Sequence, residues 1–220
     1  MTLRILIAEP DAFSQEALQA LRRMASVDCR RLDQAGMRDA LANYDVVWIR
    51  LALEVRERDL PPVPRCRVLV TATTGTDHVD SASLDRVGIT LLSLRGRREF
   101  LEGITATAEL ALCLVLSLVR HVPFAFDDVR AGRWDRDSFL GRQLSGLTAG
   151  IVGYGRLGRM MGHYLLALGM EVLAFDLIAG EMQAGVKRSE SLESLLAASD
   201  VVTVHVSLNE TSEGLFSSRA

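Results

Sequence analysis

The first hundred residues alternate between short apolar runs and segments in which apolar positions have helical spacing. The run RILIA, residues 4–8, has the composition of a buried strand, and the following SQEALQALRRM places its apolar residues on one helical face. Residues 45–51 and 67–73 are continuous apolar runs, as expected for parallel strands that are covered on both sides. The repeated order of strand, helix and strand predicts a doubly wound α/β domain. The pattern also predicts a weaker strand near residues 27–32, short helices at 37–44 and 80–88, and a strand at 89–94.

The pattern changes after residue 94. The segment RGRREFLEG, residues 95–103, interrupts the alternation, and TATAELALCLVLSLVRHV, residues 105–122, predicts a long helix that is apolar nearly all round. Such a helix is expected to be buried between two layers or two subunits. Residues 131–146 are polar and glycine-rich and predict an irregular connecting arm. A second α/β unit follows, with a strand before Gly153, a helix from Arg156, a strand at 172–176, a short strand and a helix within 185–200, and a strand at 201–208.

Composition and charge narrow the class of protein. The chain is 49% hydrophobic and 24% charged, which is typical of a soluble globular protein. Its net charge of −3 provides no general attraction to nucleic acid or to an anionic membrane. The most apolar run, residues 110–119, is short of the roughly 20 residues that a membrane-spanning helix needs. The start of the chain lacks the features of a signal peptide, so a cytoplasmic location is expected.

The three cysteines predict no special chemistry. Cys29, Cys66 and Cys113 are far apart and have no metal-ligand spacing. An odd number of dispersed cysteines favours reduced thiols over a disulfide framework. We therefore expect neither a metal site nor a structural disulfide.

Three glycines at a fixed spacing carry the most specific chemical signal. In AGIVGYGRLGRMMGHYLLALG, Gly153 allows a sharp turn out of the strand, and Gly155 lets the backbone approach a pyrophosphate. Gly158 allows the following helix to pack closely on the strand, and the free N–H groups at the start of that helix would face the phosphates. A glycine-rich turn alone can be merely structural, but the full context of strand, glycines, helix and strand predicts dinucleotide binding.

The residues around these glycines refine the prediction. Asp176 ends the next predicted strand, where a carboxylate would bind the ribose hydroxyls of the cofactor and repel a 2′-phosphate. No basic residue follows directly, since Leu177 and Ile178 come next, which favours NAD over NADP. The backbone amides of Arg156 and Leu157 should reach the phosphates. The Arg156 side chain either adds charge there or is a solvated side chain at a helix start.

Four blocks cover most of residues 68–216. They are TATTGTDHVDSASLDRVGITLL, TATAELALCLVLSLVR, GRQLSGLTAGIVGYGRLGRMMG and SLESLLAASDVVTVHVSLNETSEGLF. Together they resemble the D-isomer-specific 2-hydroxyacid dehydrogenase family, which includes phosphoglycerate, glycerate and D-lactate dehydrogenases. The interdomain helix of that family has an Ala-Glu pair, which would be Ala108 and Glu109 here.

The resemblance implies two doubly wound parallel-sheet domains, a flavodoxin-like substrate domain over residues 1–98 and an incomplete Rossmann NAD-binding domain over 99–220. Residues 104–146 would form the interdomain helix and arm, through which two copies would form a homodimer. The activity implied is hydride transfer between NAD and a small D-2-hydroxy or 2-keto acid.

The resemblance also assigns roles to single residues. Arg50 is assigned to substrate binding, with a surface ion pair as the alternative. Ser207 stands where the family usually has proline, which puts in doubt the geometry of the turn after His205. The implied substrate-binding residues are Arg50, Thr74 and Gly75. The implied cofactor-binding residues are Thr74, Thr107, Gly153, Tyr154, Gly155, Arg156, Leu157, Gly158, Asp176, His205 and Val206.

The family's catalytic arginine, glutamate and histidine lie downstream of the segment that ends at Phe216. They are therefore expected beyond Ala220, and no catalytic residue is expected within these 220 residues. None of the four histidines, His78, His121, His163 and His205, falls at a position that matches the catalytic base. The sequence thus predicts a C-terminally truncated chain that binds NAD without turnover. The alternatives are a non-catalytic NAD-sensing module, like the family's corepressor branch, and a degenerate remnant.

Overall fold

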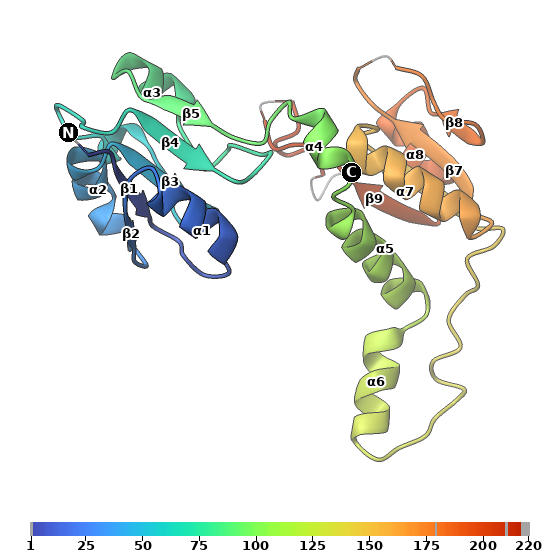
Figure 1. Cartoon of the computed structure of the whole chain (residues 1–220). Coiled ribbons are helices and arrows are strands. Elements are labelled where there is room, and N and C mark those ends of the chain that lie inside the picture. Colours follow the sequence, from blue (N-terminus) through green and yellow to red (C-terminus); the bar gives the residue numbers. More distant parts are fainter. Residues whose placement is uncertain (1, 179, 210, 217–220) are drawn as a thin grey trace. The chain divides into compact units, whose positions relative to one another are not determined.

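The computed structural model describes residues 2–178, 180–209 and 211–216. The chain divides into two compact units, and each is built on a parallel sheet with helices packed against it (Figure 1). The first unit holds the chain up to Arg98 and the described residues between Leu208 and Glu213. The second unit holds Glu99–Ser207 and the described residues from Gly214 onward. The predicted fold class, two parallel-sheet α/β domains, is confirmed.

The first unit contains a five-stranded parallel sheet in the order β2-β1-β3-β4-β5. This order corresponds to the flavodoxin-like arrangement 2-1-3-4-5, in which the chain direction across the sheet reverses between β1 and β3. Ligands of such sheets bind outside the carboxyl ends of the strands at that reversal. The elements are β1 (Arg4–Ile7), α1 (Gln15–Arg22), β2 (Ser26–Cys29), α2 (Met37–Asn43), β3 (Val46–Ile49), β4 (Val68–Thr71), α3 (Ser81–Arg86) and β5 (Thr90–Leu92), with 3-10 turns at Gln34–Gly36 and Glu57–Asp59.

The core of the first unit comes from the central strands. Leu6 of β1, Val47 of β3 and Leu69 of β4 are fully buried, together with Leu41 of α2. Val47 and Leu69 lie in the two apolar runs that the sequence pattern identifies as strands covered on both sides, and Leu6 lies in the run predicted as a buried strand. The predicted strand at 89–94 is shorter in the structure, since β5 ends at Leu92.

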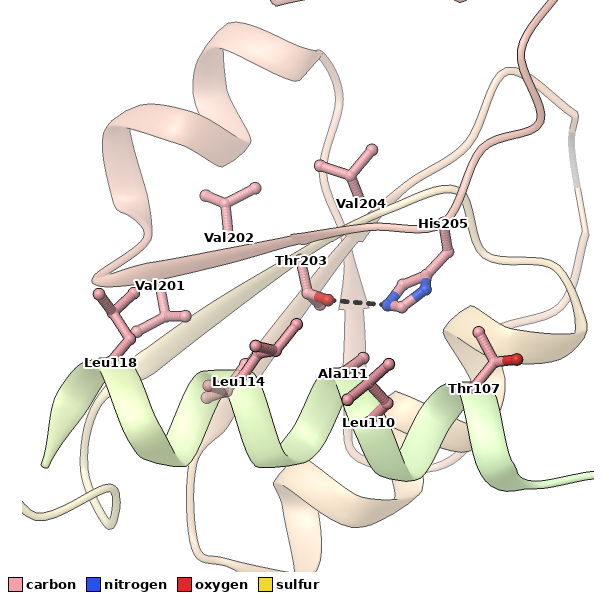
Figure 2. A pocket seen from close by; sticks show the side chains of 11 residues that line it. Thr107, Leu110, Ala111, Leu114, Leu118, Val201, Val202, Thr203, Val204 and His205 are labelled. Atoms are coloured by element: carbon pink, nitrogen blue, oxygen red, sulfur yellow. Dashed lines mark hydrogen bonds between the residues drawn. The ribbon is translucent and has the colours of Figure 1, made fainter. Parts of the chain in front are cut away.

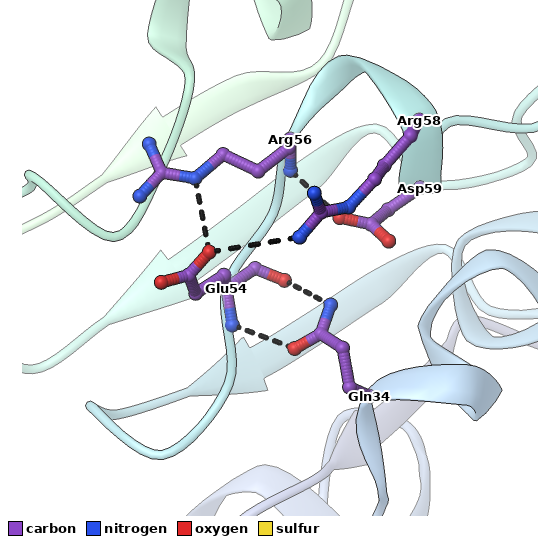
Figure 3. Close-up of polar contacts among 5 residues, drawn as sticks. All are labelled: Gln34, Glu54, Arg56, Arg58 and Asp59. Atoms are coloured by element: carbon purple, nitrogen blue, oxygen red, sulfur yellow. Dashed lines mark hydrogen bonds and ion pairs between the residues drawn. The ribbon is translucent and has the colours of Figure 1, made fainter.

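The segment after β3 is held by polar contacts rather than by a sheet (Figure 3). The Gln34 side chain accepts from the backbone N–H of Glu54 at 3.0 Å and donates to its carbonyl at 2.9 Å. The Glu54 carboxylate pairs with Arg56 at 3.2 Å and with Arg58 at 3.9 Å. Exposed ion pairs of this kind contribute little stability, so backbone contacts hold the segment. They are the two bonds from Gln34 and a short parallel bridge between Val55 and Val79, in which the Val55 N–H donates to the His78 carbonyl at 2.9 Å.

The second unit contains a four-stranded parallel sheet in the order β8-β7-β6-β9. This corresponds to strands 3-2-1-4 of the Rossmann order. A Cβ on Gly150 would lie 2.5 Å from Leu195 of α8, whereas Ile151 faces Gly158 of α7. Because neighbouring strand residues point to opposite faces, α7 and α8 cover opposite faces of the sheet. The elements are β6 (Thr148–Val152), α7 (Arg156–Ala167), β7 (Glu171–Phe175), β8 (Val186–Arg188), α8 (Leu192–Ala198) and β9 (Val201–Val204).

Three helices precede this sheet: α4 (Arg98–Glu102), α5 (Ala106–Val119) and α6 (Val122–Arg130). The long helix predicted through residue 122 is wrong at its end, because His121 takes a left-handed conformation with φ 54° and Pro123 follows in the first turn of α6. Proline is tolerated in a first helical turn but not in a helix interior, so a new helix starts here. From α6 the irregular segment returns to β6, as the sequence predicts for residues 131–146 (Figure 1).

Two further expectations for the second unit are corrected. Residues 95–103 were expected only to interrupt the pattern but contain α4, and the strand predicted at 201–208 ends at Val204. The backbone N–H of His205 still bonds to Val152, so the chain leaves the sheet just beyond that contact.

Helix α5 is apolar on most of its surface, but it is not buried all round. Its buried residues are Ala108 and Val115, and it packs against α7 and β9. Leu110, Leu114 and Leu118 are 60–69% exposed. The helical stretch Arg98–Val119 is also long and apolar enough, by length and composition, to cross a membrane, with 11% of its most apolar window buried. Core helices of soluble proteins that are mostly buried meet the same length and composition criterion, and the expectation of no membrane contact stays a prediction.

Candidate dinucleotide-binding site

The glycine loop joins β6 to α7 in the way that the motif predicts. Gly153 has φ +89°, a conformation that favours glycine, and a Cβ there would lie 2.8 Å from the backbone of His205. A Cβ on Gly158 would lie 2.1 Å from the carbonyl oxygen of Gly153, so only glycine allows α7 to start this close to β6. A Cβ on Gly155 would meet no atom within 4 Å. Gly153 and Gly158 are therefore needed for close packing of the backbone, and Gly155 faces open space.

The start of α7 presents unpaired backbone donors. Gly155 occupies the N-cap position, no side chain caps the helix, and no acidic residue lies in its first turn. The first N–H groups of a helix have no partner within the helix, and the helix dipole makes this end positive. A helix N-terminus that lacks its own acceptor fits the diphosphate of a dinucleotide.

The Asp176 carboxylate lies directly against the glycine loop. One oxygen accepts from the backbone N–H of Tyr154 at 2.6 Å, and the other accepts from that of Ile178 at 2.8 Å. The N–H of Gly153 bonds to the carbonyl of Phe175 at 2.8 Å. A carboxylate has about four acceptor positions, so Asp176 keeps capacity for ribose hydroxyls while it holds the loop.

The side chains of Tyr154 and Arg156 make contacts beside the glycine loop that the sequence does not predict. The Tyr154 ring is 5% exposed with the Arg159 guanidinium 5.2 Å above it, and burial raises the pKa of its hydroxyl. The Arg156 guanidinium donates to the carbonyls of Leu101 and Ile104, at 3.0 and 2.7 Å. The guanidinium therefore fastens the turn between α4 and α5, and contact of the Arg156 backbone with a phosphate stays a prediction.

Thr107 and His205 lie at the same end of an apolar cavity of about 390 Å³ between α5 and β9 (Figure 2). His205 Nε2 is 2.8 Å from the hydroxyl of Thr203, and burial lowers the pKa of the imidazole. Val206 borders the glycine loop, since its Cγ1 would lie 2.8 Å from a Cβ on Gly153. Predicted cofactor residues from two separate segments, Gly153 in one and His205 and Val206 in the other, are thus brought together. Leu157 is partly buried and packs against the core.

The predicted substrate-binding residues lie in the first unit, at the carboxyl ends of β3 and β4. Arg50 donates to the carbonyl of Asp11 at 3.0 Å, and its backbone N–H donates to Glu9 at 2.7 Å. The Arg50 side chain therefore bonds to a backbone carbonyl, and among the described residues it does not form the surface ion pair that was the alternative for it. Thr74 is exposed, and Gly75 is partly buried. Contact between Thr74 and a cofactor bound to the second unit stays a prediction.

Sequence reasoning missed Glu9 and the buried pair Thr71 and His78. Glu9 accepts from the N–H groups of Arg50 and Ala52, at 2.7 and 3.1 Å, and so ties the end of β3 to the end of β1. An acidic residue directly after a buried strand was the available signal. His78 Nε2 lies 3.2 Å from the Thr71 hydroxyl, a contact that no spacing rule indicates.

No histidine takes part in an ion pair with a carboxylate within the described part of the chain. His78 and His205 bond to threonine hydroxyls. His121 and His163 are exposed. A general base of the histidine–carboxylate type is therefore not assembled from the described residues.

The expected place of the catalytic arginine, glutamate and histidine is not tested by these contacts. The family resemblance leads us to expect them beyond Ala220, and Ala220 itself lies outside the described residues, which end at Phe216. That the family's catalytic residues follow Ala220 therefore stays a prediction.

The fold and the site define an α/β protein with a flavodoxin-like unit and a dinucleotide-binding unit. Comparison with known proteins agrees with this class. Residues 5–98 match the catalytic domain of the D-isomer-specific 2-hydroxyacid dehydrogenases, and residues 112–220 match the NAD-binding domain of the same family. The chain belongs to this family, and the predicted cofactor, NAD, is confirmed.

Relatives of several kinds share the fold. D-3-phosphoglycerate dehydrogenase of Archaeoglobus fulgidus is 30% identical over 97% of this chain and 40% of its own length. Hydroxypyruvate reductase of Thermotoga maritima is 27% identical over 91% of this chain and 64% of its own length. A crystal structure of D-lactate dehydrogenase from Aquifex aeolicus complexed with NAD and lactic acid matches with a TM-score of 0.82 and 25% identity, over 95% of this chain and 62% of that one. The chain thus spans about two fifths to two thirds of these relatives.

Proposed function

We propose that this chain supplies the NAD-binding part and a portion of the substrate-binding part of a dehydrogenase for a small D-2-hydroxy acid. The observation that carries the proposal is the uncapped start of α7, with the Asp176 carboxylate fixed beside it at 2.6 Å from the Tyr154 nitrogen. When bound, NAD supplies the hydride acceptor, and its reduced form supplies the hydride donor. The chain's own residues would hold the diphosphate through backbone N–H groups and the ribose through Asp176.

The substrate class follows from what the relatives act on. Their names specify phosphoglycerate, hydroxypyruvate and lactate, each a carboxylate with an adjacent hydroxyl or keto group. In our proposal the backbone amides of the Thr74–Gly75 loop receive that carboxylate. The relatives' names favour an enzyme over a non-catalytic NAD sensor.

We further propose that a polypeptide of residues 1–220 binds NADH without turnover. Support comes from the lack of a histidine–carboxylate pair among the described residues, because proton transfer at the substrate oxygen needs a positioned acid or base. The test is a fluorescence titration of the polypeptide with NADH, followed by steady-state assays with glycerate, lactate and hydroxypyruvate. Saturable NADH binding with no turnover is expected. Measurable turnover would refute the proposed lack of activity. A folded polypeptide that does not bind NADH would refute the proposed cofactor binding.

We also propose that a second copy of the chain covers α6 and the arm that follows it. Phe124 and Phe126 of α6 are 66% and 64% exposed, and Trp134 after it is 79% exposed. Several large exposed apolar side chains within one short segment are typical of an interaction surface. A dimer in solution is the expected state.

A further inference from the structure

A chain of hydrogen bonds runs from a buried histidine to the predicted substrate loop. His78 is 6% exposed and Thr71 is 1% exposed, with His78 Nε2 and Thr71 Oγ1 3.2 Å apart. Thr71 Oγ1 is 3.0 Å from Thr73 Oγ1, and Thr73 Oγ1 donates to the carbonyl oxygen of Gly75 at 2.7 Å. The chain therefore connects the interior of the first unit to the loop at the carboxyl end of β4.

The carbonyl at the end of this chain fixes the direction of every bond in it. A carbonyl oxygen accepts only, so Thr73 must give its single hydroxyl proton to Gly75. Thr71 Oγ1 has two possible acceptors, Thr73 Oγ1 at 3.0 Å and the Arg50 carbonyl oxygen at 3.4 Å. The contact with Arg50 is longer than an ordinary O–H···O hydrogen bond, so Thr71 gives its proton to Thr73. With that proton used, Thr71 can only accept from His78, which therefore carries its proton on Nε2. His78 Nδ1 is left as a buried acceptor without a partner among the described residues.

We propose that His78, acting through Thr71 and Thr73, is a positioning residue for the Gly75 peptide in the substrate loop. In a trans peptide the C=O and N–H groups point in opposite directions. Holding the Gly75 carbonyl on Thr73 therefore turns the N–H of Thr76 away from Thr73, and the carbonyl of Thr76 is itself fixed by the N–H of Val79 at 2.9 Å. The N–H of Thr76 becomes a further fixed donor for the substrate carboxylate. This inference rests on the proposed role of the Thr74–Gly75 loop.

The proton arrangement is tested first, without any ligand. Long-range ¹H–¹⁵N spectra of the 220-residue polypeptide distinguish the two neutral tautomers of a histidine. His78 is expected to carry its proton on Nε2 and an unprotonated Nδ1. A proton on Nδ1 would make Nε2 an acceptor, reverse the hydrogen bond between His78 and Thr71, and overturn the proposal.

The functional consequence is tested with oxalate as a small carboxylate probe, with binding followed through the amide signals of residues 74–76. His78→Leu and Thr71→Val are each expected to weaken oxalate binding about tenfold, since each cuts the same chain. The double variant is expected to lose no more than either single variant, because residues that act as a unit are not additive. His78→Gln keeps a side-chain N–H donor and is expected to restore binding to within about twofold of wild type.

His163→Leu is the matched control, since His163 is exposed on α7, and it should leave oxalate binding unchanged. Additive losses, or a His78→Gln variant as weak as His78→Leu, would overturn the positioning role. If wild-type protein shows no oxalate shifts at residues 74–76, the loop does not receive a carboxylate and the positioning role falls with it. NADH binding measured on the same sample would then show whether the cofactor part of the proposed function stands.

Discussion

The carboxylate of Asp176 accepts a hydrogen bond of 2.6 Å from the backbone nitrogen of Tyr154. The two residues are far apart in the chain, and the contact joins the end of β7 to the turn that precedes α7. Asp176 therefore fixes the shape of the glycine loop. In the proposed function its remaining acceptor positions bind the ribose hydroxyls.

Replacing Asp176 with asparagine should weaken NADH binding. Asparagine keeps one carbonyl oxygen for the Tyr154 N–H but loses the charge and the acceptor for the Ile178 N–H, so NADH affinity is expected to fall about tenfold. Discrimination against NADPH should weaken, because the negative charge that repels a 2′-phosphate is removed. Fluorescence titrations with both reduced cofactors measure the two affinities. Unchanged NADH affinity would show that Asp176 serves only the loop.

Two glycines of the same loop should respond differently to alanine. At Gly158 a Cβ would lie 2.1 Å from a backbone oxygen, so Gly158→Ala is expected to destabilise the second unit by roughly 1–3 kcal/mol or more. At Gly155 a Cβ meets nothing within 4 Å and φ is −78°, so Gly155→Ala should fold normally. The methyl group would occupy the space proposed for the diphosphate, and NADH affinity should fall by about tenfold or more. Thermal melting and NADH titration of both variants provide the check, and a Gly155→Ala protein with wild-type affinity would contradict the proposed site.

The first unit should lose stability in acid through Asp45. The side-chain hydrogen bonds from Arg65, at 2.9 and 3.0 Å, and then the backbone bond from Arg4 hold the pKa of Asp45 below its usual range. A depressed folded-state pKa favours folding wherever the carboxylate is ionised. This stabilisation is complete above the ordinary Asp pKa of about 3.9 and is lost as pH falls through the lower folded-state value.

Urea unfolding between about pH 6 and about pH 2 tests this contribution. The stability of Asp45→Asn should be lower than wild type at neutral pH, and the difference should shrink as pH falls. The exposed Asp85→Asn serves as a control and should follow the wild-type curve. A constant difference between Asp45→Asn and wild type at every pH would rule out the ionised carboxylate as the cause.

A charge on α6 should disrupt the proposed dimer without unfolding the chain. Phe124 is 66% exposed, so Phe124→Glu removes little packing within one copy but would place a charge in the apolar contact with a second copy. Gel filtration with light scattering is expected to show a dimer for wild type and a monomer for the variant. Met24→Glu, at an exposed position in the first unit, should remain dimeric. A wild-type monomer would refute the proposal.

The strands and the glycine loop could be predicted because their signals are local. The runs that form β1, β3 and β4 are continuous and apolar, and the conformation of Gly153 follows from a turn that few other residues allow. Helix α6 was not predicted, because its boundary depends on the left-handed His121 and on Pro123 together. The end of β9 was placed too late, since the apolar pattern continues beyond the last ladder bond.

The sequence by itself determined the order of strands and helices, the dinucleotide motif and the family, because periodicity and glycine spacing are properties of neighbouring residues. The tertiary structure decided which side chains those elements bring together. It directs the Arg156 guanidinium to backbone carbonyls of the turn before α5, and it links His78 to the Gly75 carbonyl through two threonines. Such contacts depend on the register of strands and the direction of single side chains, which only packing in three dimensions fixes.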